Sequence, residues 1–328
     1  MPAKPIRAVV VTAHGGPEVL RVQERPHIDP GPGQLLVQVA ASGVNFIDVY
    51  RRQGVYPTEP PFVLGSECAG SVVAVGPGVT DFAEGDVVAT AAAGAGSHAT
   101  ATLVDAAEAV PVPAGLSPEV AAAAMLQGMT AQYLTSSTFP VSAADTVLVH
   151  AAAGGVGQLL VQLAKARGAR VIATVGSAPK QEVAHRLGAD AVLRYDQVAD
   201  LAAAVREAAG GGVQVVYDGV GRDTFDASLA CLARRGMLVL FGAASGPVAP
   251  VDPQRLNRGG SLFLTRPTLA DYTATREELQ WRSSEVLGAL ASGALHLEIG
   301  GRYPLERAAE AYRDLEGRRT TGKLLLIP

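Results

Sequence analysis

Thr146 to Gly168 reads TVLVHAAAGGVGQLLVQLAKARG, and this stretch decides the fold. It begins with an apolar, β-branched run over 146–150, the length of a buried parallel strand, and helical spacing of apolar residues follows over 158–167. In the turn between them, Ala152, Gly154 and Gly157 take the three positions of the dinucleotide-binding fingerprint. Small residues there allow a tight turn, close approach of the backbone to a pyrophosphate and close helix–strand packing. The phosphates would lie at the helix N-terminus.

Any tight strand-to-helix turn in an α/β protein can carry such glycines, so the following residues matter. A second strand is expected over 170–175 and ends at Gly176, where NAD-specific enzymes usually have an Asp or Glu for the ribose hydroxyls. Here Gly176, Ser177 and Lys180 offer free amides, a hydroxyl and a cation instead. This favours a 2′-phosphate, and hence NADPH rather than NADH. The alternative for Lys180 is a solvated lysine at a helix start.

Composition excludes several classes of protein. The 328 residues exceed what one hydrophobic core usually serves, so two domains are expected. With 27 basic and 31 acidic residues and no cluster of Lys and Arg, neither nucleic acid nor an anionic membrane is expected as a partner. Cys68 and Cys231 form no disulfide framework or metal motif. No run reaches membrane-spanning length and the N-terminus lacks a signal-peptide core, so we expect a cytoplasmic protein.

The first 110 residues have the pattern of a β-rich domain. Strands are expected over 8–11, 35–39, 70–75 and 86–90, separated by clusters of Gly, Pro and Asp. After Pro111 the pattern changes. Ser117-Pro118-Glu119 is typical of an N-cap, a first-turn proline and a first-turn acid, and predicts an alanine-rich helix.

Beyond Gly176 the chain alternates between helices and strands, as in a doubly wound parallel sheet. Helices are expected over 180–187, 201–209 and 225–232, and strands over 191–193, 213–217, 236–241 and 262–265. Ligands of such sheets lie at the carboxyl ends of the strands, so 218–221 and 241–245 are candidates for lining the nicotinamide side. A helix over 276–291 and a last strand over 323–327 indicate that the tail returns to the first domain.

Six segments together resemble a known family. They are Asn45–Tyr50, Tyr56–Pro57, His150–Gly157, Val216–Gly221, Thr265–Pro267 and Leu324–Pro328. Their combination looks like the zinc-free NADPH:quinone oxidoreductases of the medium-chain dehydrogenase/reductase superfamily. The resemblance implies a GroES-like catalytic domain over 1–128 and 269–328 and a Rossmann NADPH-binding domain over 129–268. It also implies a homodimer formed by pairing of Rossmann-sheet strands, and hydride transfer from NADPH to a quinone or related conjugated carbonyl.

The chain departs from the zinc-dependent relatives of that family. Those relatives have a Cys where this chain has Asn45 and a His where it has Ser66, and neither Asn nor Ser is a normal zinc ligand. The four-cysteine structural zinc lobe is also missing from the sequence. The six histidines show no ligand spacing and are expected to be structural or solvated. Cys68 is expected to be a buried small residue. No metal site is therefore expected.

Without a metal, hydrogen-bond donors must polarise the substrate oxygen. By resemblance, Asn45, Tyr50, Tyr56 and Arg266 line the cleft at the nicotinamide as catalytic residues. An amide, phenols and a guanidinium can stabilise negative charge that develops on a quinone oxygen. For the tyrosines, packing with a satisfied hydroxyl is the alternative. Asp48 is expected to be structural, because a carboxylate beside developing negative charge would hinder the reaction.

The resemblance and the strand-end argument also assign the cofactor positions. The nicotinamide ribose is expected near Thr130 and Tyr133, and the adenosine 2′-phosphate near Lys180, Tyr195 and Arg318. The complete set is Asn45, Thr130, Tyr133, Gly154, Gly155, Val156, Gly176, Ser177, Lys180, Tyr195, Gly219, Val220, Phe241, Gly242, Ser245 and Arg318.

Two alternatives to a quinone reductase remain. The same zinc-free scaffold carries enone and enoyl-thioester reductases, and a fold does not fix its substrate. A thioester reductase would need cations for a carrier arm, and no extra basic cluster is evident in the sequence. The other alternative is a non-catalytic NADPH-binding protein.

Overall fold

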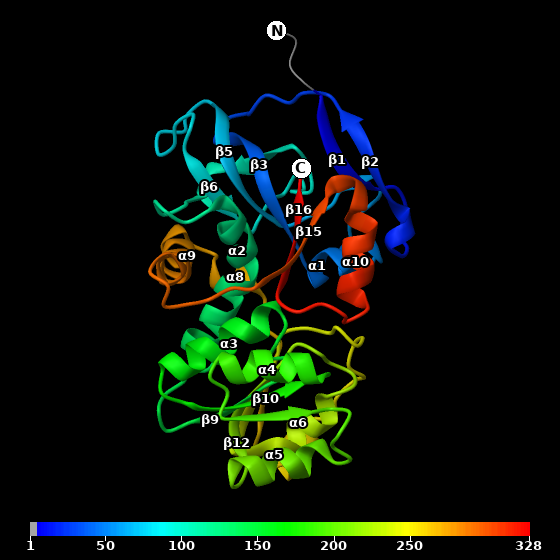
Figure 1. The fold of residues 1–328 in the computed structure, drawn as a ribbon, viewed down its shortest axis with the longest axis vertical. Helices are drawn as coiled ribbons and strands as arrows, with labels where there is room; N and C mark the ends of the chain where they lie inside the picture. The colour runs from blue at the N-terminus through cyan, green and yellow to red at the C-terminus, as the bar shows by residue number, and fades with distance from the viewer. Residues whose placement is uncertain (1–4) are drawn as a thin grey trace. The chain divides into compact units, whose positions relative to one another are not determined.

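The computed structural model describes residues 5–328. They form two compact units (Figure 1). Unit 1 comprises the residues up to Met129 together with Thr273–Pro328, and unit 2 comprises Thr130–Tyr272. Helix α2 (Pro118–Tyr133) runs from one unit into the other. Among the described residues, no helix combines the length and the apolar character needed to cross a membrane.

Unit 2 is a six-stranded parallel sheet with the strand order β11-β10-β9-β12-β13-β14. Helices α3 and α4 lie on one face and α5 and α6 on the other (Figure 1). The strands are β9 (Thr146–Val149), β10 (Arg170–Val175), β11 (Ala191–Arg194), β12 (Val213–Asp218), β13 (Leu232–Leu240) and β14 (Phe263–Thr265). The helices are α3 (Gly155–Ala166), α4 (Ala178–Arg186), α5 (Leu201–Ala209), α6 (Phe225–Cys231), α7 (Gln254–Arg258) and α8 (Leu269–Tyr272).

This sheet confirms the expected doubly wound fold, with small differences at the ends of elements. Helix α3 begins at Gly155, three residues before the expected 158, because Gly155 and Gly157 already belong to its first turn while Gly154 is the extended N-cap residue. Strand β13 begins at Leu232 rather than 236, and Leu232 is the one residue that it takes from the helix expected over 225–232. The core consists of buried aliphatic side chains from strands and helices, such as Leu148, Ile172 and Leu238. These side chains explain why the central strands are nearly continuous apolar runs.

Unit 1 contains a three-stranded sheet, β2-β1-β4, and a larger sheet in the order β15-β16-β3-β5-β6-β8, in which β7 also pairs with β3. The first strands are β1 (Ile6–Val11), β2 (Leu20–Arg25), β3 (Gln34–Val44), β4 (Phe62–Val63) and β5 (Glu67–Val75). The later ones are β6 (Val87–Thr90), β7 (Ala101–Asp105), β8 (Val110–Pro111), β15 (Ile299–Pro304) and β16 (Lys323–Ile327). Helices α1 (Phe46–Arg52), α9 (Arg276–Ala291) and α10 (Ala308–Glu316) also belong to this unit.

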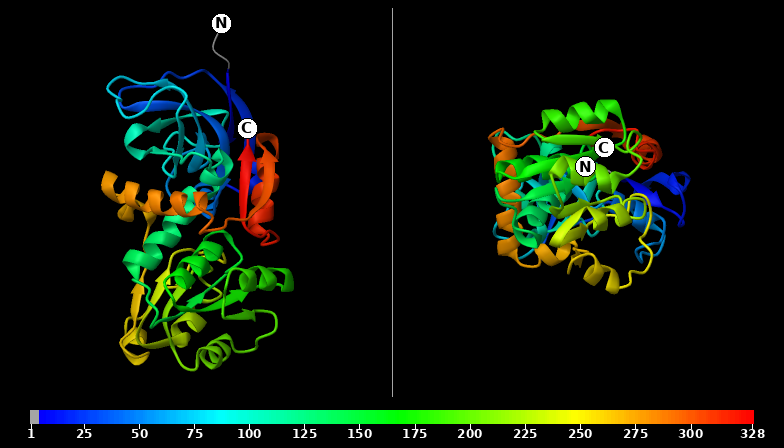
Figure 2. Two further views of the ribbon diagram at one scale, coloured as in Figure 1. Left: turned by 60° about the vertical axis from the view of Figure 1, so that its left-hand side comes forward. Right: turned by 90° about the horizontal axis from the view of Figure 1, so that it is seen from below.

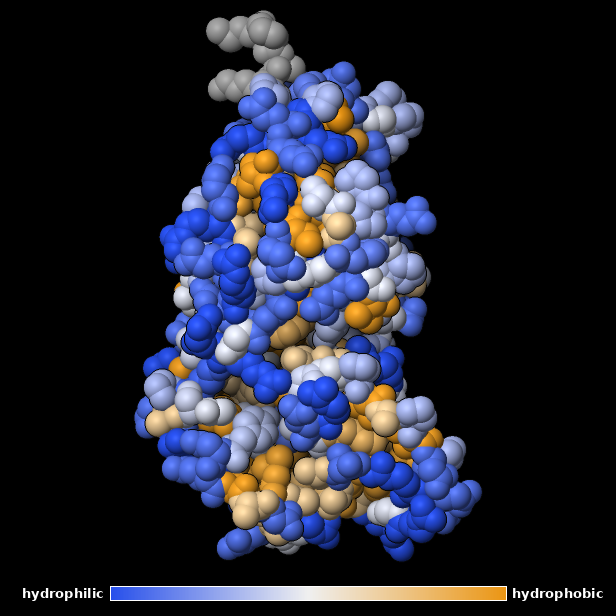
Figure 3. Space-filling model, turned by 90° about the vertical axis from the view of Figure 1, so that its right-hand side faces the viewer, coloured by the Kyte–Doolittle hydropathy of each residue, from blue (hydrophilic) through white to orange (hydrophobic). Residues whose placement is uncertain are grey.

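The tail completes unit 1. Strand β16 pairs antiparallel with β3 and parallel with β15, and α10 lies against this part of the sheet (Figure 2). The four strands expected before residue 110 are present, but β2, β4, β7, β8 and β15 and the helices α1 and α10 were not predicted. The face seen in Figure 3 is mostly hydrophilic, with apolar residues in scattered patches, as is normal for a folded protein.

Candidate active site

The carboxyl edge of the unit 2 sheet collects the turns that the sequence singles out. Strands β9, β10, β12 and β13 end there and lead into 150–154, 176–177, 219–221 and 241–245. The strand order reverses between β9 and β12, and in open α/β sheets ligands bind beside such a switch point. Unit 2 therefore places Gly154, Gly176, Gly219 and Gly242 along one edge, where a dinucleotide could lie across them.

The turn after β9 is held by backbone contacts. The amide of Ala152 donates to the carbonyl of Thr174 (3.1 Å), and the amide of Gly154 donates to that of Ala151 (2.9 Å). A Cβ on Gly157 would lie 2.4 Å from the Ala151 carbonyl oxygen, so only glycine allows α3 to start this close to the strand. Helix α3 is 12 residues long and presents the unpaired amides of its first turn, which suit a pyrophosphate.

The turn after β10 is open. A Cβ on Gly176 would meet no atom within 4 Å, so the backbone there is free for close approach by a ligand. Ser177 is the N-cap residue of α4, yet its hydroxyl does not cap the helix. Lys180 lies in the first turn of α4 and is half-buried. Without an acidic side chain at the end of β10, this turn suits a phosphate better than a pair of ribose hydroxyls.

A buried polar chain crosses the same edge beneath the turns. His150 Nδ1 lies 2.7 Å from Thr174 Oγ1, and His150 Nε2 lies 3.0 Å from Ser228 Oγ. Ser228 in turn donates to Asp218 Oδ2 (2.7 Å). Burial lowers the pKa of His150, although Asp218 opposes this, so the imidazole is neutral and bridges the ends of β9, β10 and β12. The structural role expected for His150 agrees with this geometry.

Tyr195 is engaged in that chain. Its hydroxyl accepts hydrogen bonds from Thr174 Oγ1 (2.7 Å) and the Ala151 amide (3.3 Å) and lies 3.2 Å from His150 Nδ1. The tyrosine thus ties the end of β11 to the dinucleotide turn. The predicted contact with an adenosine phosphate stays a prediction.

Asp218 lies in the 218–221 segment that the sequence assigns to the nicotinamide side, but its role in holding this loop was not predicted. Its Oδ1 accepts hydrogen bonds from the amides of Val220 (2.8 Å) and Gly221 (3.0 Å), and both of its oxygens accept from Thr224. The carboxylate therefore shapes the loop expected at the nicotinamide side. An acidic residue that ends a buried strand just before Gly-Val-Gly was the available signal.

The loops after β12 and β13 are packed against each other. A Cβ on Gly242 would lie 2.5 Å from the Gly219 carbonyl oxygen, and a Cβ on Gly219 would lie 2.8 Å from the Phe241 ring. Ser245 Oγ donates to the Val220 carbonyl (2.8 Å). The five predicted cofactor residues of these loops are thus brought together within unit 2, and mutual packing already requires glycine at positions 219 and 242.

The two residues expected at the ribose are both buried. Thr130 is 8% exposed, and Tyr133 is 2% exposed and stacks on Tyr272 with ring centroids 4.2 Å apart. The Tyr133 ring is therefore a packing element of unit 2, and only its hydroxyl could reach a ribose.

In unit 1, the predicted catalytic residues Asn45, Tyr50 and Tyr56 come from one short segment around α1. The rings of Tyr50 and Tyr56 meet edge to face, 5.6 Å apart, and Tyr56 is 40% exposed. Both phenols are thus accessible or partly accessible. Arg266 belongs to unit 2, where it is exposed and donates a long hydrogen bond (3.4 Å) to the Pro267 carbonyl. Arg318 belongs to unit 1 and has a left-handed backbone (φ 55°).

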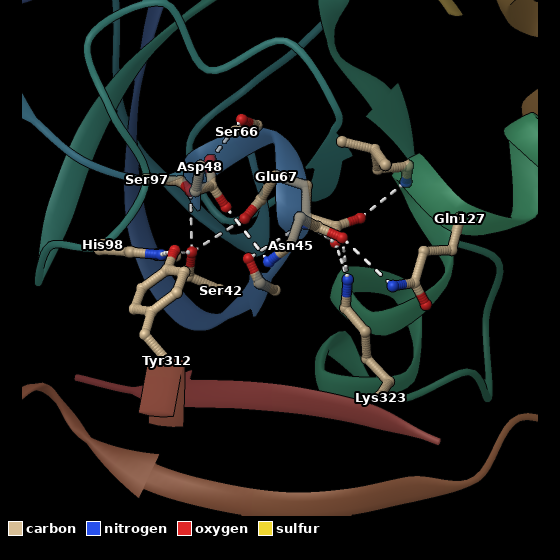
Figure 4. A network of polar contacts seen from close by, with 12 residues as sticks. Ser42, Asn45, Asp48, Ser66, Glu67, Ser97, His98, Gln127, Tyr312 and Lys323 are labelled. Atoms are coloured by element: carbon tan, nitrogen blue, oxygen red, sulfur yellow. Dashed lines mark hydrogen bonds and ion pairs between the residues drawn. The ribbon is translucent and has the colours of Figure 1, made fainter. Parts of the chain in front are cut away.

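Asn45 is built into a buried network instead of being presented to a ligand. Its Nδ2 donates to Glu67 Oε1 (2.6 Å) and to the Gly43 carbonyl (3.2 Å). Its Oδ1 accepts from Lys323 Nζ (2.6 Å) and from Gln127 Nε2 (3.2 Å) (Figure 4). Both amide protons are therefore used, and the side chain is 2% exposed. Direct donation from Asn45 to a substrate oxygen does not fit this arrangement, and we assign it a positioning role.

The centre of this network is an ion pair between Lys323 and Glu67, both fully buried. Glu67 Oε2 also accepts from the Leu126 amide (2.6 Å). Figure 4 shows Lys323 reaching from β16, and Gln127 from α2, toward Asn45 and Glu67. Burial lowers the pKa of Lys323, and the Glu67 carboxylate raises it in opposition. The pair joins β5, α2 and β16 at one point.

A second cluster of buried polar side chains includes Ser66, Asp48 and His98. Ser66 Oγ donates to Asp48 Oδ1 (2.7 Å), and Asp48 Oδ2 accepts from the Asn45 amide (3.2 Å), so Asp48 caps α1 and is structural as expected. Burial raises the pKa of Asp48 to about 6. His98 lies 2.7 Å from Ser42 Oγ and 2.8 Å from the Tyr312 hydroxyl, and burial lowers its pKa to about 3.

The described residues contain no group of three or more His, Cys, Asp and Glu side chains arranged to hold a metal ion. Cys68 is buried, as expected, and burial raises the pKa of its thiol to about 12. A thiol in this setting is inert.

Comparison with known proteins gives the class first. Residues 31–138 match the family model for the alcohol dehydrogenase GroES-like domain, and residues 155–281 match that for zinc-binding dehydrogenase. The first match extends from β3 past the end of α2, and the second from α3 into α9. The chain thus has the two-part architecture of the medium-chain dehydrogenases.

Full-length relatives then identify the family. Quinone oxidoreductase 1 of Escherichia coli (strain K12) is 44% identical over 96% of this chain and 97% of its own length. A 2-haloacrylate reductase of Burkholderia sp is 42% identical over 98% and 99%. The chain belongs to the quinone oxidoreductase family of the medium-chain dehydrogenase/reductase superfamily.

Solved structures agree with this family. The mycobacterial protein Rv1454c complexed with NADPH is 53% identical, with a TM-score of 0.95 over 98% of this chain and 100% of that one. The Escherichia coli quinone oxidoreductase complexed with NADPH is 43% identical, with a TM-score of 0.94 over the same shares.

Proposed function

We propose that this protein reduces quinones by direct, metal-independent hydride transfer. Its family and the NADPH complexes of similar structures make it an NADPH-dependent quinone oxidoreductase. The observation that carries the proposal is the carboxyl edge of the unit 2 sheet, where glycine turns, helix amides and one lysine coincide. When bound, NADPH supplies the hydride and both electrons, and solvent supplies the proton for the reduced oxygen.

The residues of unit 2 fit this cofactor. The open backbone at Gly176 and the first-turn amides of α3 can accept phosphate groups without rearrangement. We assign the pyrophosphate to Gly154, Gly155 and Val156, and the 2′-phosphate to Ser177, Lys180 and Arg318. Asp218 and Ser245 hold the loop expected at the nicotinamide.

Metal independence is supported by the chemistry of Asn45 and Ser66. Neither residue type is a normal zinc ligand, and both side chains already take part in hydrogen bonds of the protein. We therefore assign polarisation of the substrate oxygen to Tyr50, Tyr56 and Arg266, whose donors can stabilise developing negative charge. Asn45 shapes the start of α1 and so positions the segment that carries the two phenols.

A second candidate acceptor is an activated alkene. It is favoured by the relative described as a 2-haloacrylate reductase, which matches this chain over nearly its full length. Oxidation of NADPH at 340 nm with 1,4-benzoquinone, 9,10-phenanthrenequinone and crotonyl-thioester separates the candidates. Quinone turnover supports the proposal; turnover of the thioester alone points to an enoyl reductase, and tight NADPH binding without turnover points to a non-catalytic protein.

The phosphate assignment predicts a large effect on cofactor selectivity. Replacing Lys180 and Arg318 by Ala removes the charge opposed to the 2′-phosphate, which NADH lacks. The KM for NADPH should rise about 10-fold to 100-fold, while the KM for NADH changes little. Steady-state kinetics with both cofactors measure this. Equal changes for NADPH and NADH would refute the assignment.

We also propose a cytoplasmic homodimer. Strand β14 is an edge of the unit 2 sheet, and its Phe263 is 55% exposed, which suits pairing with the same strand of a second copy. Analytical ultracentrifugation of the wild type and of Phe263→Lys tests the dimer.

A further inference from the structure

Unit 1 contains a cavity whose lining includes one positively charged side chain. Its volume is about 470 Å³, within the range of small-molecule sites. Its lining includes Tyr56, Thr58, Gly65, Gly94 and Gly96. The remaining lining is neutral, apart from Arg51. A ligand here would therefore meet small uncharged groups, a phenol and a guanidinium.

Arg51 and its neighbour Arg52 have opposite environments. Arg52 is fully buried, and its two Nη atoms bind the Glu316 carboxylate at 2.9 and 3.0 Å, while its Nε donates to the Gly15 carbonyl. Arg52 therefore links α1 to α10 and has a structural role. Arg51 is half-buried, and one of its Nη atoms donates to Ser66 Oγ (3.1 Å). Among the described residues, no carboxylate lies within ion-pair distance of Arg51.

The Ser66 contact orients Arg51 without neutralising it. The Ser66 hydroxyl donates its hydrogen bond to Asp48, which is fully buried and which also accepts a hydrogen bond from the Asn45 amide. Asp48 is thus separated from the guanidinium by a hydroxyl. Ser66 fixes one end of the Arg51 guanidinium, and the other N–H groups can donate hydrogen bonds to a ligand in the cavity. A pre-oriented guanidinium recognises a pair of coplanar oxygen atoms better than a single neutral one.

We propose that Arg51 makes this cavity a carboxylate subsite for the electron acceptor. The inference rests on the proposed function and narrows its substrate class: conjugated acceptors that bear a carboxylate are reduced in preference to matched neutral ones. The carboxylate binds Arg51, and the phenol of Tyr56 flanks it. The conjugated portion of the acceptor extends beyond the subsite.

The test compares acceptors that differ only in charge. A naphthoquinone with a propanoate side chain and the corresponding propanamide have nearly the same shape. The wild type should show kcat/KM for the acid about 10-fold above that for the amide, mainly through KM. This preference should shrink as salt is raised, because the site is half-exposed. Benzoate should likewise inhibit more strongly than benzamide.

Variants assign the preference to Arg51. Arg51→Gln should reduce the acid-to-amide ratio to about 1, and Arg51→Lys should leave an intermediate value because it keeps the charge but loses the fork. Arg25→Gln, an exposed arginine of β2 in the same unit, is the matched control and should keep the wild-type ratio.

Three outcomes overturn the inference. They are equal kcat/KM for acid and amide in the wild type, equal inhibition by benzoate and benzamide, or an unchanged ratio in a folded Arg51→Gln variant. If Arg51→Gln does not fold, the inhibition pair decides with the wild type alone. Turnover of 1,4-benzoquinone tests the proposed function separately. If the enzyme reduces 1,4-benzoquinone but shows no preference for the acid over the amide, only the carboxylate subsite is refuted.

Discussion

In unit 2 the buried polar chain of His150, Ser228 and Asp218 lies at the carboxyl edge of a parallel sheet, whereas unit 1 buries a full ion pair among strands and a helix. In unit 2 the side-chain hydrogen bonds of Asp218 run to residues at most ten positions away. In unit 1, Lys323 binds Glu67 and Asn45, which are 256 and 278 positions away in the chain. The first arrangement shapes a loop; the second fixes how distant segments meet.

This difference has an energetic consequence. A carboxylate that receives hydrogen bonds from its own loop is stabilised locally, and the loop forms with it. A buried ion pair must offset the desolvation of both charges, and it leaves an uncompensated charge when one partner is lost. Unit 1 should therefore be far more sensitive to single charge changes than unit 2.

The largest expected effect follows from removing Lys323. Lys323→Met leaves the Glu67 carboxylate buried without its counter-charge, which should lower the free energy of unfolding by about 3–5 kcal/mol. The double variant Lys323→Met/Glu67→Gln removes both charges and should recover a large part of this loss. Urea unfolding followed by circular dichroism measures the cycle.

The matched control for this cycle is the partly exposed pair in unit 2. Lys165 and Asp190 are 33% and 36% exposed and meet at 2.9 Å, so Lys165→Met should cost less than about 1 kcal/mol. Losses of similar size for Lys323→Met and Lys165→Met would break the comparison between the two units.

A second effect concerns pH and Asp48. Burial raises its pKa from 3.8 to about 6, so the native state holds this proton to higher pH than the unfolded state does. Its contribution is fully present below about pH 4 and is lost as pH rises to about 6. The corresponding change in stability is up to about 3 kcal/mol. The difference in unfolding free energy between wild type and Asp48→Asn should fall by that amount between pH 4 and pH 7.

Asp190 provides a control of opposite sign. Burial tends to raise its pKa, but hydrogen bonds from Lys165 and the Val171 amide outweigh burial and lower it. Its stabilisation is therefore present above the unfolded pKa and lost as pH falls. The difference in unfolding free energy between wild type and Asp190→Asn should rise with pH. This rise should be smaller than the fall expected for Asp48, since the Lys165–Asp190 pair is partly exposed. A rise with pH for Asp48 as well would contradict the burial argument.

The sequence predicts most of unit 2 because its signals are local. Strand β10 and helix α5 match their expected bounds, and the glycine turn after β9 lies where the fingerprint requires it. Each signal there lies within a strand-helix-strand unit. Asp218 was missed as a loop organiser because its role depends on the course of the loop after it, which hydrophobic periodicity does not describe.

Unit 1 was harder to predict because its decisive contacts are distant in sequence. Asn45 was expected to donate to a substrate, but Glu67 and Gly43 take both amide protons. Lys323 gave no signal, since it opens an apolar final strand and its partner lies in β5. Helix α1 was missed because its seven residues are too short for a helical period to stand out.

The smallest expected effects come from two glycines of unit 2 that have different reasons to be glycine. A Cβ on Gly157 would meet backbone atoms of Ala151 and Ala152 at 2.4 and 2.8 Å, so Gly157→Ala should cost about 1–3 kcal/mol of stability. A Cβ on Gly176 would meet nothing, so Gly176→Ala should leave the unfolding free energy within about 0.5 kcal/mol.

The same pair separates folding from cofactor binding. Gly176→Ala should raise the KM for NADPH about tenfold, because its methyl group occupies space that we assign to the cofactor. Gly288→Ala is the control: Gly288 is exposed on α9, with no atom within 4 Å of an added Cβ, and it should leave the KM unchanged. Thermal unfolding and NADPH kinetics on the three variants measure both quantities. An unchanged KM for NADPH in Gly176→Ala would refute our placement of the adenosine side of the cofactor at the end of β10. The turn after β9 would still be tested separately by Gly157→Ala.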